Sequence, residues 1–274
     1  MRSSSNISRP NQPITTAQNQ IQPGNGSRQS GEIAVVGIGP GSLDDMTPRA
    51  RQAIVNADIV VGYNTYIALI RALVENKQLI GTAMMQEIER CQMAVDEALT
   101  GKKIAVVSSG DPGIYGMAGL ILELVMKQPE AVRPKVTVIP GISAVGAAAA
   151  ILGAPLMHDF AVISLSDLLT PWELIKKRAE MAAAGDFVIA IYNPKSKKRV
   201  TQIEEIRQIV LAHRPSSTPV GIVHQASRTG EEMELSSLAE FTALPIDMFS
   251  LVIIGNSQTY VAGGRMITPR GYRV

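Results

Sequence analysis

The chain has 274 residues, of which 46% are hydrophobic and 18% charged, so it can bury a large core and is not globally disordered. Its one cysteine and three histidines exclude an intrachain disulfide and argue against a metal cluster, so no metal site is expected. The net charge of +2 is too small, and the 4% of aromatic residues too few, for a protein that binds nucleic acid.

The N-terminus carries that net charge. Residues 1–30 contain three arginines and no acid, a charge of +3, whereas the other 23 basic and 24 acidic residues give −1. This segment is rich in Ser, Asn, Gln, Pro and Gly, and we expect a disordered tail. The chain has neither the apolar stretch of a secretory signal nor one long enough to span a membrane, which favours a cytoplasmic protein. An organelle transit peptide stays open as an alternative for the tail.

Short β-branched runs alternate with helical patterns along the first half of the chain. A helix is expected to begin at Pro48, with Thr47 as its N-cap. Further helices are expected over 64–75, 84–99 and 144–152, and strands over 33–36, 59–61, 104–107 and 136–139. The strands are continuously apolar, which is typical of a sheet covered on both faces.

The second half repeats this alternation, with strands expected over 161–163, 187–191, 220–223 and 251–254. One helix should begin with a capping box at Thr170–Glu173, and another should cover 198–212. The sequence Gly153-Ala154-Pro155 interrupts the pattern and is the candidate domain boundary. We therefore predict an α/β fold of two α/β domains, 31–154 and 155–262, with a cleft between them and a C-terminal tail over 263–274.

The residues that could bind a ligand or take part in chemistry lie in loops that directly follow strands. Ligands of open α/β sheets bind at the carboxyl ends of the strands. Five such loops are present, at 37–41, 108–116, 140–144, 192–194 and 224–227. Their shared position predicts a ligand cleft between the two domains.

The first loop, Gly37–Gly41, is similar to a dinucleotide fingerprint but does not complete it. Ser42 stands where G-x-G-x-x-G requires its third glycine, and the nearby acid, Asp58, precedes the second strand instead of following it. These departures argue against an NAD-dependent oxidoreductase. A glycine-rich turn without a ligand remains an alternative.

The loops after the third and fourth strands are more informative. Gly110, Gly113 and Gly116 would let a backbone approach a ligand closely, and Asp111 could accept hydrogen bonds from a ribose diol or bind an ammonium group. Asp111 could instead only cap the next helix. Ser143 is an N-cap that could also contact a ligand carboxylate.

Other polar groups allow fewer conclusions. The basic run Lys195–Arg199 is either a solvated helix start or an attractor of an anionic substrate. His158 and His224 both lack metal-ligand spacing, and His224, in a strand-end loop, is a cleft candidate. Cys91 lies in a predicted helix and is expected to be inert. The chain contains no G-x-S-x-G nucleophile motif.

Taken together and in this order, the loops resemble those of the tetrapyrrole methylases, a family of S-adenosylmethionine-dependent methyltransferases. The resemblance covers residues 32–258 and rests on Val36–Gly41, on Gly110-Asp111-Pro112 with Tyr115-Gly116, and on Pro140–Ala144. Three further stretches, 61–66, 164–172 and 191–196, are similar to the branch of the family that methylates carbon 17 of a corrin precursor.

The resemblance implies that S-adenosylmethionine binds in the interdomain cleft. Its contacts would be Pro40, Ser109, Gly110, Asp111, Ile114, Ser143, Ala144, Asn193 and Ala226. Family members often have glycine at the position of Ser109. The first loop would face the tetrapyrrole, and substrate contacts would be Gly39, Gly41, Ser42, Lys195 and Arg228, with Arg265 as a further partner for its carboxylates.

The activity implied by the resemblance is methyl transfer to carbon 17 of a reduced tetrapyrrole with contraction of the ring, by a homodimer. The acid–base group for the contraction stays unknown, with His224 and Ser42 as candidates. Metal-free and cobalt-containing substrates both stay open. The alternatives are another methylase of the same pathway and a protein that binds a tetrapyrrole or adenosyl ligand without catalysis.

Overall fold

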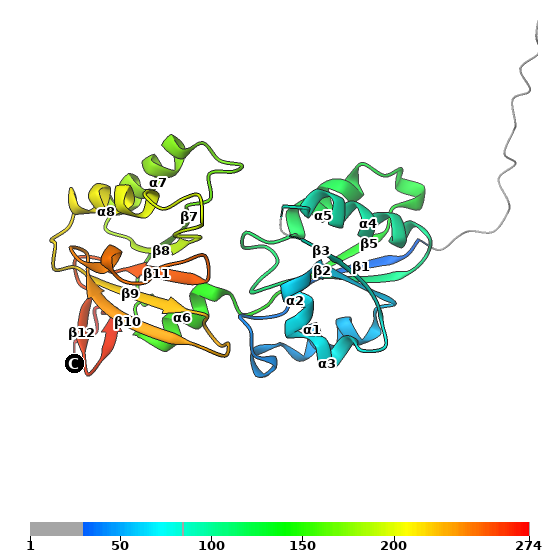
Figure 1. The fold of residues 1–274 in the computed structure, drawn as a ribbon, viewed down its shortest axis with the longest axis horizontal. Helices are drawn as coiled ribbons and strands as arrows, with labels where there is room; N and C mark the ends of the chain where they lie inside the picture. Colours follow the sequence, from blue (N-terminus) through cyan, green and yellow to red (C-terminus); the bar gives the residue numbers. More distant parts are fainter. Residues whose placement is uncertain (1–29, 84, 274) are drawn as a thin grey trace, which may run out of the picture.

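The computed structural model describes residues 30–83 and 85–273, which form two lobes side by side (Figure 1). The tail predicted over 1–30 lies outside the described residues except for Ser30. Each lobe is built around a five-stranded sheet with helices on both faces, which confirms the predicted α/β class. No helix in the described ranges has both the length and the apolar character needed to cross a membrane.

The sheet of the first lobe is entirely parallel, with strand order β3-β2-β4-β1-β5. Its strands are β1 (Glu32–Gly37), β2 (Ile59–Tyr63), β3 (Gln78–Thr82), β4 (Lys103–Ser108) and β5 (Lys135–Ile139). One face is covered by α1 (Pro48–Asn56), α2 (Asn64–Leu69) and α3 (Arg71–Val74), the other by α4 (Glu87–Leu99) and α5 (Ala118–Met126). The short helices η1 (Leu43–Asp45) and η2 (Glu130–Val132) lie in connections.

The sheet of the second lobe is mixed, with strand order β10-β9-β11-β8-β7. Its strands are β7 (Phe160–Ser164), β8 (Val188–Tyr192), β9 (Pro219–His224), β10 (Glu232–Ser237) and β11 (Ser250–Ile254). Strand β11 is antiparallel to both β8 and β9, so these two run in the same direction and end at the same edge. The helices α7 (Trp172–Ala184) and α8 (Gln202–Leu211) cover one face, and η3 (Phe241–Ala243) precedes β11.

The helix α6 (Ala144–Leu152) covers the other face of the second sheet, so the domain boundary predicted at 154 is wrong. Its buried residues pack with Val188 and Val223 in one core. A Cβ on Gly221 would lie 2.5 Å from Leu152 Cδ2, so the bare glycine makes room for the helix. The chain therefore changes lobe in the loop before α6, because this alanine-rich helix packs on the second sheet.

The predicted C-terminal tail is also wrong, because residues 263–274 are in part ordered into a sheet. Strands β12 (Tyr260–Ala262) and β13 (Arg265–Ile267) form a hairpin, and β13 pairs in parallel with β6 (Gly153–Ala154). Met266 is fully buried in the core beneath α6. Strands of two or three residues are too short to give a periodic signal.

Helix ends test the capping predictions directly. Thr47 Oγ1 accepts a hydrogen bond from Ala50 N at 3.1 Å, and Ser143 caps α6, as predicted. The capping box at Thr170 does not form: α7 begins one residue later, after an extended Pro171 that makes no side-chain cap. The helix predicted over 64–75 is divided at Ile70 into α2 and α3.

Candidate ligand site between the lobes

Three loops of the first lobe pack directly against one another through glycine. They follow β1, β4 and β5 and are called the glycine loops below (37–41, 109–116 and 140–143). A Cβ on Gly141 would lie 2.3 Å from the Gly110 carbonyl oxygen, and one on Gly37 would lie 2.6 Å from the same atom. Gly39 and Gly110 exchange both backbone hydrogen bonds, at 3.3 and 2.7 Å, and both have positive φ. Much of the glycine in these loops therefore serves contact between loops.

Asp111 ties two of these loops together. Its Oδ1 accepts from Gly113 N at 2.8 Å, and its Oδ2 accepts from Gly141 N at 3.1 Å. A carboxylate offers about four acceptor positions, so two remain for a ligand. Gly113 and Ile114 beside it are exposed, which leaves the outer side of this loop open.

Two tyrosines connect the glycine loops to the second lobe, and the sequence prediction assigned neither to the site. Tyr115 has a φ of 53° and donates through its hydroxyl to the Val162 carbonyl of β7 at 3.1 Å. Its ring lies 5.3 Å from that of Tyr192, centroid to centroid, and burial raises the pKa of both phenols. Tyr192 Oη accepts from Val145 N, which belongs to the first turn of α6, at 3.0 Å. The quoted family motif contains Tyr115 and is the one signal that pointed to it.

The loop after β8 brings Asn193 to the same edge. Asn193 has a φ of 52°, and its Nδ2 donates to Ser164 Oγ at 2.9 Å. Its carbonyl accepts from Arg199 Nη2 at 2.7 Å. Arg199 is buried, which lowers its pKa, and Asp167 at 3.8 Å partly offsets that effect. The basic run is therefore divided: Arg199 supports Asn193, whereas only the lysines are left to meet an anion.

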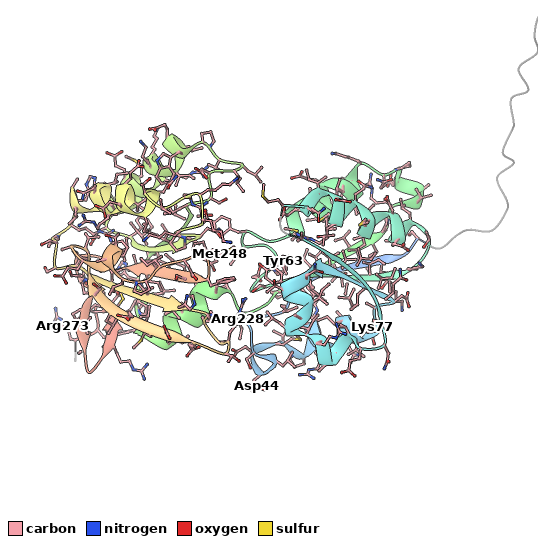
Figure 2. All side chains as sticks on the ribbon, in the orientation of Figure 1. Asp44, Tyr63, Lys77, Arg228, Met248 and Arg273 are labelled. Carbon is pink, nitrogen blue, oxygen red and sulfur yellow. The ribbon has the colours of Figure 1, made fainter. Side chains whose placement is uncertain are left out.

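Arg228, from the loop after β9, reaches across to the first lobe (Figure 2). Its Nε donates to the Pro40 carbonyl at 2.7 Å, and its Nη2 donates to Ser109 Oγ at 2.8 Å. Burial lowers the pKa of Arg228, and the neighbouring Tyr66 acts in the opposite direction. The predicted cofactor residues Pro40 and Ser109 are thus held by a residue that was predicted to contact substrate.

The candidates for acid–base chemistry are occupied elsewhere. His224 Nδ1 lies 3.2 Å from Asp247 Oδ1, and its Nε2 lies 3.0 Å from the Gln225 side-chain amide. Ser42 caps η1 by accepting from Asp44 N at 3.1 Å.

Arg265, the further candidate for the substrate carboxylates, lies elsewhere. It donates to the Ile151 carbonyl at the far end of α6 from Ser143, so it is not part of the loop cluster.

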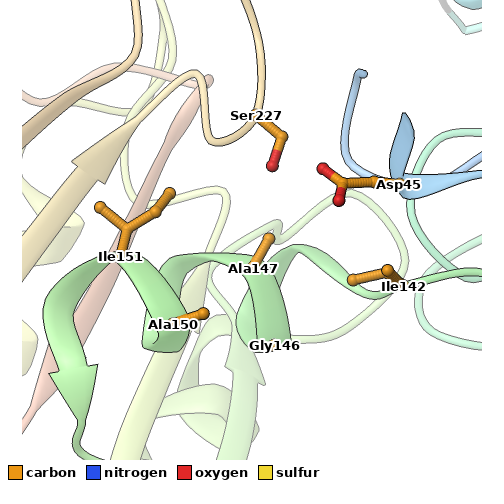
Figure 3. Close-up of a pocket in the computed structure, with 7 residues that line it drawn as sticks. All are labelled: Asp45, Ile142, Gly146, Ala147, Ala150, Ile151 and Ser227. Atoms are coloured by element: carbon orange, nitrogen blue, oxygen red, sulfur yellow. The ribbon is translucent and has the colours of Figure 1, made fainter. Parts of the chain in front are cut away.

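A pocket of about 330 Å³ lies beside these loops, against the exposed face of α6 (Figure 3). It is lined by Asp45, Ile142, Gly146, Ala147, Ala150, Ile151 and Ser227. Asp45 comes from the first lobe and Ser227 from the second, so both lobes contribute to it (Figure 3). None of the predicted cofactor residues lines this pocket, although Ser143 and Ala144 begin the same helix.

The described residues hold no group of three or more His, Cys, Asp or Glu side chains arranged for a metal ion. Cys91 lies in the core between α4 and the first sheet, and burial raises the pKa of its thiol to about 11. A neutral, buried thiol is a poor nucleophile, which agrees with the inert role expected for it.

Residues 32–242 match the family model described as Tetrapyrrole (Corrin/Porphyrin) Methylases. The chain belongs to this family. Both the predicted family and the predicted fold are therefore confirmed.

Relatives within the tetrapyrrole methylases are named methyltransferases. The chain is 53% identical over 240 residues to the probable cobalt-factor III C(17)-methyltransferase of Salmonella typhimurium, covering 88% of this chain and 99% of that protein. It is 49% identical over 245 residues to the cobalt-factor III methyltransferase of Priestia megaterium, covering 89% of this chain. The match spans only 45% of that longer relative.

Solved structures of the family agree with the fold. The crystal structure of the methyltransferase CobJ matches with a TM-score of 0.82 and 36% identity, over 88% of this chain and all of that one. A uroporphyrin-III C-methyl transferase from Thermus thermophilus, complexed with S-adenyl homocysteine, matches with a TM-score of 0.66 over 82% of this chain and 92% of that one. At 19% identity this second likeness concerns the fold alone.

Proposed function

We propose that this tetrapyrrole methylase transfers a methyl group from S-adenosylmethionine to carbon 17 of a corrin precursor, the precorrin-3B or cobalt-factor III step, with contraction of the ring. The observation that carries the proposal is the 53% identity across nearly the whole length of the Salmonella relative, whose name specifies both the substrate and the carbon. The stretches at 61–66, 164–172 and 191–196 support the same branch.

Between the two forms of the substrate, we favour the cobalt-containing one. Two relatives named for cobalt-factor III are 53% and 49% identical to this chain. In this proposal cobalt arrives as part of the substrate, so the chain needs no metal ligands of its own.

The residues between the lobes fit an adenosyl cofactor. The spare acceptor positions of Asp111 suit a ribose diol, and the exposed Gly113 leaves room beside them. The N-terminus of α6 at Ser143 and Ala144 suits the carboxylate of a methionyl group, because backbone N–H groups and the helix dipole favour an anion there. S-adenosylmethionine, when bound, supplies an electrophilic methyl group on its sulfonium.

The protein's contribution to methyl transfer is placement. A reduced tetrapyrrole is itself nucleophilic at carbon, so no side-chain nucleophile is needed, and correct alignment alone contributes several kcal/mol. Residues of both lobes would hold the two reactants: the glycine loops from the first lobe, and the N-terminus of α6 with Asn193 and Ala226 from the second. Lys195 and the exposed Lys197 and Lys198 would meet the carboxylates of the substrate. Gly39, Gly41 and Ser42 would border the macrocycle.

The homodimer is an expectation from the family resemblance, and the cytoplasmic location is an expectation from the sequence. We propose a homodimer that acts in the cytoplasm. Light scattering of the purified chain tests the dimer, and fractionation of the source cell tests the location.

A turnover assay tests the function. The purified protein is incubated with S-adenosylmethionine and with cobalt-factor III or precorrin-3B, and products are followed by mass, absorbance and ¹³C NMR. We expect one added methyl group at carbon 17 and a contracted ring, with faster turnover of the cobalt form. Methylation at another carbon without contraction would identify another methylase of the pathway. Binding of S-adenosylhomocysteine and tetrapyrrole without any product would favour a non-catalytic binding protein.

A further inference from the structure

Arg228 makes an unusual set of contacts for a charged residue between lobes. Both of its hydrogen bonds end on neutral oxygens of the first lobe, the Pro40 carbonyl and the Ser109 hydroxyl. Among the residues that the structure describes, no Asp or Glu forms an ion pair with it. Arg207, in the same lobe, instead pairs with Glu204 on the surface of α8. Arg228 therefore serves directional hydrogen bonding more than charge neutralisation.

Gly41 provides the space that Arg228 occupies. A Cβ at position 41 would lie 2.2 Å from Arg228 Cγ and 3.0 Å from the Ser227 carbonyl oxygen. Any side chain at this position would displace the stem of the arginine. The first loop and the loop after β9 are thus complementary in shape as well as in hydrogen bonding.

The contact with Ser109 also orients its hydroxyl. Because Ser109 Oγ accepts from the guanidinium, its own proton is directed elsewhere and can be donated to a ligand. Ser109 precedes Gly110 and Asp111, so the arginine acts on the loop that offers the free acceptors of Asp111.

We propose that Arg228 is a positioning residue: from the second lobe it fixes the Pro40 and Ser109 segments of the first lobe, and thereby sets the shape of the cofactor site. The inference rests on the proposed function and replaces the expectation that Arg228 contacts substrate. Its planar fork can bridge two acceptors, which a lysine ammonium on a flexible stem holds less well.

Binding and kinetics distinguish a positioning role from substrate contact. For Arg228→Ala, we expect the affinity for S-adenosylhomocysteine, measured by calorimetry, to fall about tenfold or more, because two hydrogen bonds of a charged donor are lost. The KM for S-adenosylmethionine should rise more than the KM for the tetrapyrrole, and Arg228→Lys should restore only part of the affinity. Arg207→Ala is the matched control and should bind like the wild type. Unchanged cofactor affinity with a raised KM for tetrapyrrole would overturn the proposal.

A double variant tests the fit with Gly41. Gly41→Ala should weaken binding about as much as Arg228→Ala, because it displaces the arginine. When Gly41→Ala is added to Arg228→Ala, the affinity for S-adenosylhomocysteine should fall by less than a further factor of about three. The added methyl group then no longer collides with the arginine side chain. Fully additive losses would contradict the inferred pairing.

Hydrogen exchange of the ligand-free protein separates this inference from the proposed function. Arg228→Ala should speed exchange of the amides in 39–42 and 109–113, whereas Arg207→Ala should not. Unchanged exchange in those segments would overturn the positioning role. Failure of the wild type to bind S-adenosylhomocysteine would instead count against the proposed function, and the exchange result would still decide the role of Arg228.

Discussion

The two lobes contribute to the same edge in different ways. The first lobe has a fully parallel sheet, and its glycine loops touch through backbone atoms. The second lobe has a mixed sheet, and its contribution is made by side chains: Tyr192, Asn193 and Arg228 each reach a partner outside their own loop. The first lobe therefore supplies a backbone surface. The second lobe supplies side chains, of which Arg228 reaches that surface while Tyr192 and Asn193 bond to α6 and β7 of their own lobe.

This difference predicts different sensitivities to mutation. In the first lobe, adding a single methyl group should be damaging, because the spaces between loops are already filled. In the second lobe, removing a hydrogen-bonding side chain should be damaging, because it leaves buried carbonyl groups without donors.

The largest effect is expected for Gly141→Ala. Its Cβ would lie 2.3 Å from the Gly110 carbonyl oxygen, so the glycine loops must separate. We expect cofactor affinity to fall about 100-fold and the free energy of unfolding to fall by about 3 kcal/mol. Calorimetry with S-adenosylhomocysteine and urea denaturation measure the two quantities. The control is Gly119→Ala in α5, where a Cβ meets nothing within 4 Å. Gly119→Ala should keep its affinity for S-adenosylhomocysteine, and its free energy of unfolding should rise by about 0.5–1 kcal/mol. Equal behaviour of the two variants would contradict the explanation that the glycine loops touch through backbone atoms.

The second lobe should be most sensitive at Arg214. This buried arginine donates to the carbonyls of Ala182, Phe187 and Gly255, and burial lowers its pKa. Arg214→Leu removes the arginine donor from the Phe187 and Gly255 carbonyls, while the Ala182 carbonyl still accepts from Phe187 N, so we expect a loss of about 3 kcal/mol in the free energy of unfolding. The folded fraction should still bind S-adenosylhomocysteine, because the residue lies away from the loops. A loss below about 0.5 kcal/mol in urea denaturation would show that the arginine is dispensable.

An effect of intermediate size is expected for Asp111→Ala, which tests whether the 109–116 loop binds ligand. Removing the carboxylate leaves Gly113 N and Gly141 N without their acceptor, so we expect the free energy of unfolding to fall by about 1 kcal/mol. The contacts to the cofactor are lost as well, so its affinity should fall about tenfold or more. Calorimetry with S-adenosylhomocysteine gives the answer. Affinity equal to that of the wild type would mean that the cofactor site is misplaced.

The smallest effect is expected at the surface of the second lobe, at Glu204. Hydrogen bonds from Arg207 lower the pKa of this carboxylate to about 2, so its contribution is present above pH 4.5 and is lost as the pH falls from there toward 2. Glu204 is partly exposed, and its replacement by Gln should cost less than about 1 kcal/mol at pH 7. Unfolding curves of the two proteins should approach each other as the pH falls from 4.5 through 2. A constant difference across this range would contradict the ion-pair explanation.

Much of the fold could be predicted because buried strands carry a strong apolar signal. All eight strands expected from apolar runs are present, since each lies in a sheet with helices on both faces. The strands of the two five-stranded sheets that were missed, β3 and β10, lie at sheet edges and are half exposed and more polar. The lobe to which α6 belongs could not be predicted, because its position in the chain follows the first sheet whereas its packing is on the second.

The meeting of the loops could be predicted where it depends on strand ends. Asp111, Ser143 and Asn193 converge because their strands end at the edges that face each other. The role of Arg228 depends on contacts with residues 188 and 119 positions away in the chain, and no local pattern encodes such a pairing. The sequence therefore singled out Arg228 as a candidate for ligand contact but not its partners in the first lobe.

Hydrogen exchange with and without S-adenosylhomocysteine tests the central claim most directly, because it reports both lobes at once. If the cofactor is held between them, protection should rise in 109–116 and 141–146 and, in the same experiment, in 192–194 and 225–228. Protection confined to one lobe, or absent from all four segments at saturating ligand, would contradict the account.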